Sequence, residues 1–143
     1  MRARVAAIAI AALVAACSAV IPGERPKITL RNGTELLIKL SVNEIAVGHF
    51  PPGRPQPDVD ESALPPLPWD IEGRTVSGRL VLSLHVDPGQ LHVERQPDGA
   101  IRASIGMARA DLSCGTLWLW AGEITPGGPA PMPDAGKPGD CVP

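Results

Sequence analysis

The stretch LVLSLHVDPGQLHVERQPDGAIRASIGM, residues 80–107 of the 143-residue chain, decides the predicted fold. Apolar residues recur at every second position from Leu80 to Val86 and again from Leu91 to Glu94, and a period of two is typical of β-strands. Pro88-Gly89 and Pro97-Asp98-Gly99 interrupt the alternation, and both are typical turn sequences. The stretch therefore predicts a meander of three antiparallel strands.

The side chains of these three strands match one another when the strands are paired across the two turns. Apolar residues then face apolar residues, and a negative charge faces a positive one. The paired positions are Val86 with Leu91, His85 with His92, Ser83 with Glu94, and Glu94 with Arg102. Agreement between turn sequences, alternation and charge favours a real sheet.

The same register places three candidate metal ligands close together. Directly opposed residues have Cβ atoms about 4.5 to 5.5 Å apart, so His85 and His92 could share a divalent metal. Glu94 would be a third ligand, with one coordination position left open. The alternative is a pair of surface histidines on an exposed sheet face. We expect no other cofactor.

Residues 27–50 predict a first group of three strands. The period of two begins at Ile28, resumes from Leu36 to Val42, and is followed by an apolar stretch at residues 45–50. Asn32-Gly33 and Asn43-Glu44 are the expected turns. We expect the middle strand to be the longest of the three.

Residues 51–68 differ from the segments on either side because seven of them are prolines. Proline has no backbone N–H to donate to a sheet and favours extended polyproline geometry. The stretch is therefore predicted to be a connector that crosses between two groups of strands, or a segment at a sheet edge.

The last strong strand is predicted from Leu112 to Trp120. Trp118 and Trp120 share one face, while Leu117 and Leu119 share the other. Because both faces are apolar, we expect this strand to be central in its sheet. The two indoles could form a stacking platform for a sugar ring or another apolar ligand, and the alternative is that they pack within the domain.

Cys114 and Cys141 are predicted to form a disulfide. The chain has three cysteines, and if Cys17 is modified as described below, an even pair remains. A bridge between them would close a loop of about 27 residues, which corresponds to about 3 to 4 kcal/mol in the chain-entropy model. It would also pin the Pro/Gly-rich tail, residues 123–143, to the domain.

Together these segments predict an all-β fold, a small immunoglobulin-like sandwich of about seven or eight strands in two sheets. The sandwich would span residues 27–122, with the proline-rich connector at residues 51–68. Residues 1–16 would be a signal peptide and residues 17–26 a tether.

The first sixteen residues have the features of an export signal. Arg2 and Arg4 precede an uncharged run from Val5 to Ala16, which is the length of a signal-peptide core and shorter than a membrane-spanning helix. An uncleaved anchor that continues to Ile21 is the alternative at the lower limit of spanning length.

Val14-Ala15-Ala16-Cys17 resembles the lipobox of bacterial lipoproteins. The resemblance covers only the signal segment, and it implies lipidation of Cys17, cleavage after Ala16 and attachment to the cell membrane or the outer membrane on its extracytoplasmic face. Two or three acyl chains give stable attachment, whereas one gives only marginal binding. An ordinary secretory signal with an incidental cysteine is the alternative.

The rest of the sequence gives little indication of an activity. Without Arg2 and Arg4 the chain has 11 basic and 15 acidic residues, and it has no basic patch of the kind that binds nucleic acid. Catalytic motifs such as G-x-S-x-G and H-E-x-x-H are absent. Residues 64–69 and 77–79 resemble stretches of uncharacterised exported bacterial proteins, and this resemblance implies no known activity.

We therefore expect a lipid-anchored envelope protein that acts as a non-catalytic binding or structural module. Its partner would be another envelope protein or a glycan. A metal-binding lipoprotein and an extracytoplasmic hydrolase with dispersed catalytic residues are the alternatives.

Overall fold

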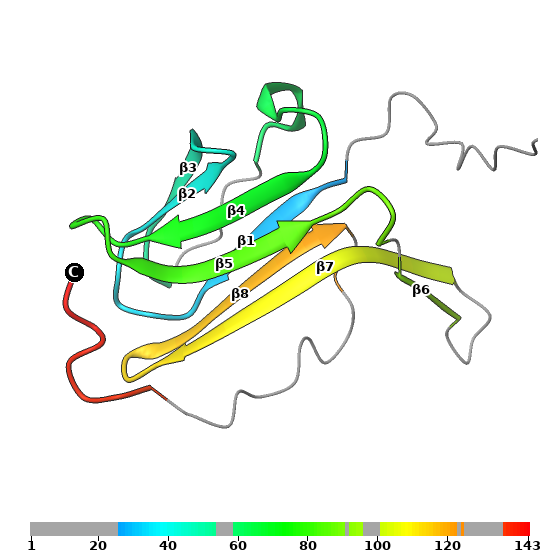
Figure 1. Cartoon of the computed structure of the whole chain (residues 1–143). Coiled ribbons are helices and arrows are strands. Elements are labelled where there is room, and N and C mark those ends of the chain that lie inside the picture. The colour runs from blue at the N-terminus through cyan, green and yellow to red at the C-terminus, as the bar shows by residue number, and fades with distance from the viewer. Residues whose placement is uncertain (1–25, 54–58, 91, 96–100, 123, 125–135) are drawn as a thin grey trace, which may run out of the picture.

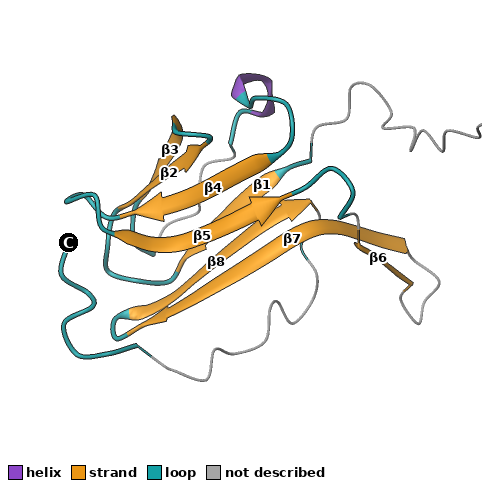
Figure 2. Cartoon of the chain, in the orientation of Figure 1, coloured by secondary structure: helices purple, strands orange, loops and turns teal. Residues whose placement is uncertain are grey.

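The chain folds into two antiparallel sheets packed face to face, as the sequence predicts (Figure 1). The computed structural model describes residues 26–53, 59–90, 92–95, 101–122, 124 and 136–143, without the side chains of residues 92–95 and 101–104. Within these residues lie eight strands and one short 3-10 helix (Figure 2). Their bounds are β1 Ile28–Asn32, β2 Ile38–Val42, β3 Ile45–Phe50, η1 Glu61–Ala63, β4 Trp69–Arg74, β5 Leu80–Val86, β6 His92–Arg95, β7 Ile101–Leu112 and β8 Gly115–Gly122.

The strand order is β1-β8-β7-β6 in sheet A and β3-β2-β4-β5 in sheet B. The first and last strands are therefore neighbours in one sheet. In an immunoglobulin domain these two strands belong to different sheets, so the likeness to that fold is limited to the two-sheet architecture. Among the described residues, no helix is both long and apolar enough to cross a bilayer.

The core lies between the sheets and is built from the inward positions of the alternating strands. Each of β1, β2, β4, β5 and β8 contributes two or more fully or nearly fully buried side chains. They include Ile28, Leu30, Ile38, Leu40, Val42, Trp69, Ile71, Leu82, Val86, Leu117, Leu119 and Ala121. Burial of each large apolar side chain contributes about 1.5 to 3 kcal/mol, so this layer is the main source of stability.

The predicted pairing of β5 with β6 is wrong. The two strands lie in different sheets, and β5 pairs with β4, which places Asp70 rather than His92 opposite His85. The second half of the meander is confirmed, because β6 pairs with β7 in the predicted register with Glu94 opposite Arg102.

β5 and β6 lie along the same side of β7, each beside a different part of it. β6 is hydrogen-bonded to the first part of β7, and β5 lies beside the later part, where the Leu84 side chain faces Gly106 (Figure 1). The arrowheads of β5 and β7 point in opposite directions. Residues 87–90 therefore pass the chain from sheet B to sheet A, and they do not reverse it as a hairpin turn would.

The first group of strands is also divided between the two sheets. β1 pairs with β8, whereas β2 pairs with β3 and β4, so Asn32-Gly33 marks a crossing and not a hairpin. Asn43-Glu44 is a hairpin turn as predicted, and both residues have positive φ, 48° and 68°, as a type I′ turn requires. β2 is one residue shorter than β3, so the middle strand is not the longest.

The proline-rich connector joins two strands of the same sheet, β3 and β4, which flank β2. Its described residues help to close the core, because Val59 and Leu64 are buried in the core cluster. The indole N–H of Trp69 donates to the carbonyl oxygen of Pro65 at 2.8 Å. The predicted crossing between two groups of strands therefore stays within one sheet and is partly buried.

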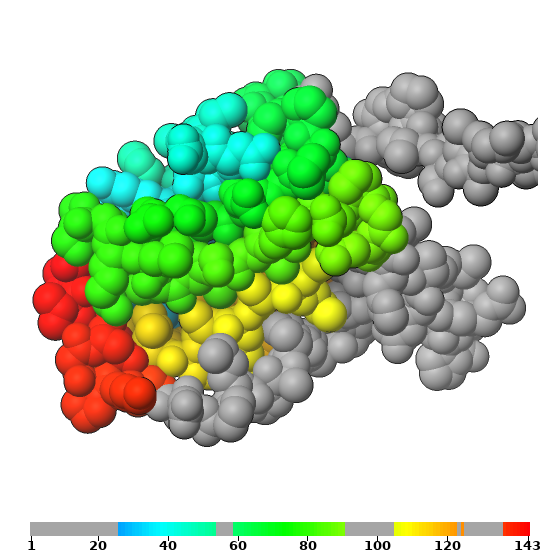
Figure 3. Space-filling model, viewed as in Figure 1, coloured from blue at the N-terminus to red at the C-terminus, as the bar shows by residue number. Residues whose placement is uncertain are grey.

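β8 is central in sheet A, as the apolar character of both its faces predicts, with Leu117 and Leu119 fully buried in the core. A turn at Ser113-Cys114 separates it from β7, so the predicted strand from Leu112 includes this turn. Figure 3 shows the C-terminal residues 136–143, in red, against the end of the sandwich where this turn lies.

Candidate functional site

The outer face of sheet B brings several titratable side chains together. Alternation along β4 buries Trp69 and Ile71 and turns Asp70 and Glu72 outward. On the neighbouring strand, Ser83 is paired with Glu72 and His85 with Asp70. Paired residues share a face of the sheet, so these polar groups form one surface.

His85 lies between two carboxylates on this face. Its Nδ1 is 2.6 Å from Oδ1 of Asp70, and its Nε2 is 3.3 Å from Oδ1 of Asp87. These two hydrogen bonds, the one to Asp70 first, raise the pKa of His85 above its ordinary value of 6.5. All three side chains are well exposed, so solvent screens the charges and the interaction is moderate.

A shallow depression of about 380 Å³ lies beside this group. It is lined by Asn43, Glu44, Asp70, Ile71, Glu72, Ser83 and Leu84. The Asn43 side chain fixes the β2–β3 turn to β4, because its amide donates to the Pro68 carbonyl at 3.1 Å and its oxygen accepts from the Asp70 N–H at 2.8 Å. The carboxylates of Glu44, Asp70 and Glu72 give the depression an acidic character.

The structure removes the geometric basis of the predicted metal site. That prediction required β5 and β6 to pair so that His85 would face His92, and these strands lie in different sheets. The side chains of His92 and Glu94 are not among those described. In the described part of the chain, no three His, Cys, Asp or Glu side chains are arranged to hold a metal ion.

The His85 group also lacks the arrangement of a hydrolytic triad. Such a triad needs one ring nitrogen to accept a proton from a nucleophile while the other is held by a carboxylate. Both nitrogens of His85 have carboxylate partners. Ser83 lies two residues away on the same strand, but no hydrogen bond joins it to His85 among the contacts of the described residues.

Trp118 and Trp120 lie on the outer face of sheet A, and their rings stack on each other. The ring centroids are 5.7 Å apart and the planes differ by 11°. The guanidinium of Arg109 lies 4.7 Å from the Trp118 centroid, and that of Arg31 lies 5.8 Å from the Trp120 centroid. Trp120 is only 2% exposed, so its ring is not open to a ligand as a stacking platform requires.

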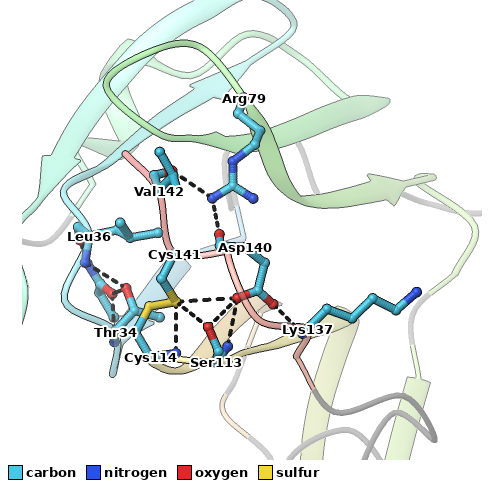
Figure 4. Close-up of a disulfide and its surroundings, with 10 residues drawn as sticks. Thr34, Leu36, Arg79, Ser113, Cys114, Lys137, Asp140, Cys141 and Val142 are labelled. Carbon is cyan, nitrogen blue, oxygen red and sulfur yellow. Dashed lines mark hydrogen bonds between the residues drawn. A yellow bond between two sulfur atoms is a disulfide. The ribbon is translucent and has the colours of Figure 1, made fainter.

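The predicted disulfide is formed. Cys114 and Cys141 are joined with their Cα atoms 5.9 Å apart, which is within the usual range for a bridge. The backbone N–H of Cys114 also donates to Sγ of Cys141 at 2.8 Å. The bridge holds the C-terminal segment against the β7–β8 turn (Figure 4).

Asp140 and Arg79 hold the same segment from two sides (Figure 4). The carboxylate of Asp140 accepts from the Ser113 hydroxyl at 2.5 Å, from the Ser113 N–H at 3.0 Å and from the Lys137 N–H at 2.8 Å. The two bonds from Ser113 are the main reason that the pKa of Asp140 lies below its usual value. Arg79 donates to the carbonyl oxygens of Asp140 and Val142.

Sequence reasoning missed the partners in each of these groups. The alternation of apolar and polar residues in Trp69-Asp70-Ile71-Glu72 could have identified β4, and a hairpin through Gly78 would then have placed Asp70 opposite His85. No local pattern pairs Arg79 with the C-terminal segment, because these residues are about sixty positions apart. The signal segment and Cys17 lie outside the described residues.

No protein-family model, curated protein or solved structure matches the chain.

Proposed function

We propose that the protein is a lipid-anchored module of the cell envelope that binds or supports a partner without catalysis. The observation that carries the proposal is the disulfide between Cys114 and Cys141. Stable disulfides are typical of proteins that fold outside the cytoplasm, and this one leaves Cys17, the last residue of the lipobox-like sequence, as the remaining cysteine of the chain.

The arrangement of the domain supports this role. The strands begin at Ile28, so residues 17–26 would serve as a tether between an acylated Cys17 and the sandwich. β1 pairs with β8, which ties the start of the domain to its last strand. The sandwich would then stand at the extracytoplasmic surface of a membrane.

A non-catalytic role agrees with the site geometry. Both nitrogens of His85 are occupied by carboxylates, and the depression beside it is shallow and acidic. Recognition of a partner through the outer face of sheet B, where Glu44, Asp70 and Glu72 border the depression, requires no reacting group. An envelope protein or a glycan with basic or hydrogen-bond-donating groups would suit this surface.

Membrane fractionation of the Cys17→Ser variant tests the anchor. We expect the unmodified chain to be recovered with membranes and to gain the mass of a diacylglyceryl group after loss of residues 1–16. The variant should be released in soluble form or keep its signal, because a serine hydroxyl does not replace the acylated thiol. Cys114→Ser is the matched control, which removes a different cysteine and should leave membrane association intact.

Equal membrane association of the Cys17→Ser variant and the wild-type chain, with no lipid mass on either, would contradict the proposal. Intact mass under non-reducing conditions gives a second readout. The mature chain should carry one disulfide, and free thiols at both Cys114 and Cys141 in material from the envelope would count against an extracytoplasmic address.

A further inference from the structure

Among the described contacts, one side-chain hydrogen bond attaches the crossing at residues 87–90 to β5. The other hydrogen bonds of the crossing close it on itself, because the Gln90 N–H donates to the Asp87 carbonyl at 3.1 Å and the Asp87 N–H donates to the Gln90 side-chain oxygen at 3.5 Å. A side chain added at Gly89 would meet no atom within 4 Å. After the buried last residue of β5, the contact that fixes the crossing is therefore the one between Asp87 and His85.

The surroundings of His85 show which protonation state makes this contact. Its Nδ1 lies 2.6 Å from Oδ1 of Asp70, and its Nε2 lies 3.3 Å from Oδ1 of Asp87. An ionised carboxylate only accepts hydrogen bonds, so both ring nitrogens carry a proton when both contacts are formed. The arrangement is therefore that of the charged imidazolium, in agreement with the raised pKa of His85.

Loss of one proton leaves only one of the two contacts of His85. A neutral imidazole has one N–H donor and one acceptor nitrogen. The hydrogen bond to the nearer carboxylate, that of Asp70, keeps the remaining proton on Nδ1. The lone pair of Nε2 then faces the carboxylate of Asp87, and two acceptors repel each other. Deprotonation therefore removes the contact to the crossing and keeps the contact to β4.

The other charged groups with described side chains around His85 do not replace its positive charge. On the outer face of sheet B, Arg74 is bound to Glu72 at 2.8 Å. On the other side of β5, the described charged side chains of β7 are Arg109 and Asp111, which bind each other on the outer face of sheet A. The groups on the same face as His85 are Asp70, Glu72 and Arg74 of β4, Glu44 of the β2–β3 turn and Asp87 of the crossing.

We infer that His85 is a pH-sensitive switch that attaches the crossing at residues 87–90 to sheet B. In its protonated form it binds Asp70 on β4 and Asp87 at the start of the crossing, and the crossing is ordered. In its neutral form it keeps Asp70 and releases Asp87, and residues 87–90 become more mobile. The switch goes beyond the proposed function, and it depends on neither the lipid anchor nor a partner.

Nuclear magnetic resonance of the full chain carrying Cys17→Ser, which cannot be acylated, tests the switch. The pH is raised from about 5 to about 9, across the ordinary pKa of histidine. The ring nitrogen shifts of His85 report its protonation, and we expect the neutral ring to keep its proton on Nδ1. Order parameters of Gly89 and Gln90, measured at Cα to avoid amide exchange, should fall from about 0.85 toward about 0.6. The midpoint of this change should equal that of the His85 titration.

The Asp87→Asn variant separates the switch from a general effect of pH. An amide can accept a hydrogen bond from the charged ring and donate one to the neutral ring, so residues 87–90 should stay ordered throughout the titration. His85→Gln should also remove the transition. The matched control is His49→Gln, which changes the exposed histidine of β3 in the same sheet. It should leave the transition and its midpoint unchanged.

Two outcomes would overturn the switch. The first is order parameters of Gly89 and Gln90 that are equal above and below the midpoint of the His85 titration. The second is a transition at these two residues that persists in Asp87→Asn or in His85→Gln, because another group would then control the mobility of the crossing.

Discussion

Asn32 is the buried polar residue on which the crossing between the two sheets depends. It is 4% exposed, and its amide nitrogen donates to the carbonyl oxygens of Leu36 and Phe50 at 2.7 and 2.8 Å. Its side-chain oxygen accepts from the N–H and the hydroxyl of Thr34 at 3.0 and 2.7 Å. One side chain thus satisfies backbone groups of two segments, the crossing at residues 34–36 and the end of β3, which would otherwise be buried without partners.

We predict that Asn32→Ala lowers the free energy of unfolding by about 2 to 4 kcal/mol, because it leaves several buried groups unsatisfied. Urea denaturation measures the change. Asn43→Gly is the matched control, since it removes the same amide from an exposed turn and tolerates the positive φ. Its effect should be about 1 kcal/mol or less. Equal effects of the two variants would show that burial of Asn32 is unimportant.

His85 gives the outer face of sheet B a dependence on pH. Its pKa is raised, first by the hydrogen bond that it donates to Asp70 and then by the one that it donates to Asp87. A raised pKa means that protonation stabilises the fold, so this contribution is fully present below the ordinary value of 6.5. It is lost as the pH rises through the folded-state pKa.

Asp70→Asn should therefore lower the pKa of His85 toward 6.5, as measured by the titration of its ring protons. The wild-type chain should be more stable than the variant just below pH 6.5, the ordinary pKa of histidine, where His85 is protonated. The difference should shrink as the pH rises above the folded-state pKa. Glu44→Gln removes a charge from the same depression and should shift the titration less. An unchanged titration in Asp70→Asn would contradict the assigned partner.

At this scale the sequence predicted the types of residue but not their partners. The Cys114–Cys141 bridge was predictable because only one pair remains after Cys17 is set aside. Asn32 was expected in a turn, because asparagine before glycine favours turns. Its buried network joins residues of three segments, and such a network depends on the packing of the sheets, which no local pattern encodes.

Among the elements, the strands were more predictable than their neighbours. The period of two identified β2 and β5, and matched charges identified the β6–β7 register. The pairing of β5 with β6 was wrong for a physical reason. Val86 and Leu91 are apolar and flank a turn sequence, and this pattern is equally compatible with a chain that bends from one sheet into the other. Only the pairing of β5 with β4 distinguishes the two arrangements.

Two glycines allow the backbone of β8 to approach the crossing after β1. The Gly33 N–H donates to the Thr116 carbonyl at 2.9 Å, and a side chain at Gly115 would overlap the carbonyl group of Gly33. Gly115 also has φ of 129°, which is unfavourable for residues with a side chain. The close approach and the unusual φ both require glycine.

We predict that Gly115→Ala destabilises the domain by about 3 kcal/mol or more, because backbone strain adds to a collision with backbone atoms. Thermal denaturation measures the effect. Gly78→Ala is the matched control, because Gly78 also has positive φ, 92°, but its added Cβ would meet nothing within 4 Å. Its effect should be about 1 to 2 kcal/mol. Similar losses in both variants would mean that φ alone decides the cost.

For the whole molecule, the disulfide is the main constraint on the unfolded chain. Replacing both Cys114 and Cys141 by alanine should lower the free energy of unfolding by about 3 to 4 kcal/mol, from the loop of 27 residues that the bridge closes. Arg79 and Asp140 still hold the C-terminal segment in the folded state. Denaturation with and without reductant measures the loss.

In the wild-type chain, reductant should reproduce most of the effect of the double variant, and it should have no effect on the double variant itself. A double variant as stable as the oxidised wild-type chain would contradict this prediction. It would mean that the bridge does not reduce the conformational entropy of the unfolded chain.

The position of β1 at a sheet edge, directly after the proposed tether, affects how the domain responds to force. β1 is an edge strand of sheet A with one hydrogen-bonded neighbour, β8, so a pull on an anchored Cys17 is transmitted to the sandwich through that single ladder. A pull along β1 shears all its hydrogen bonds together, whereas a pull across the sheet breaks them one at a time from Ile28. If Cys17 is anchored as proposed, the direction of the pull therefore decides how much force the pairing of β1 with β8 withstands.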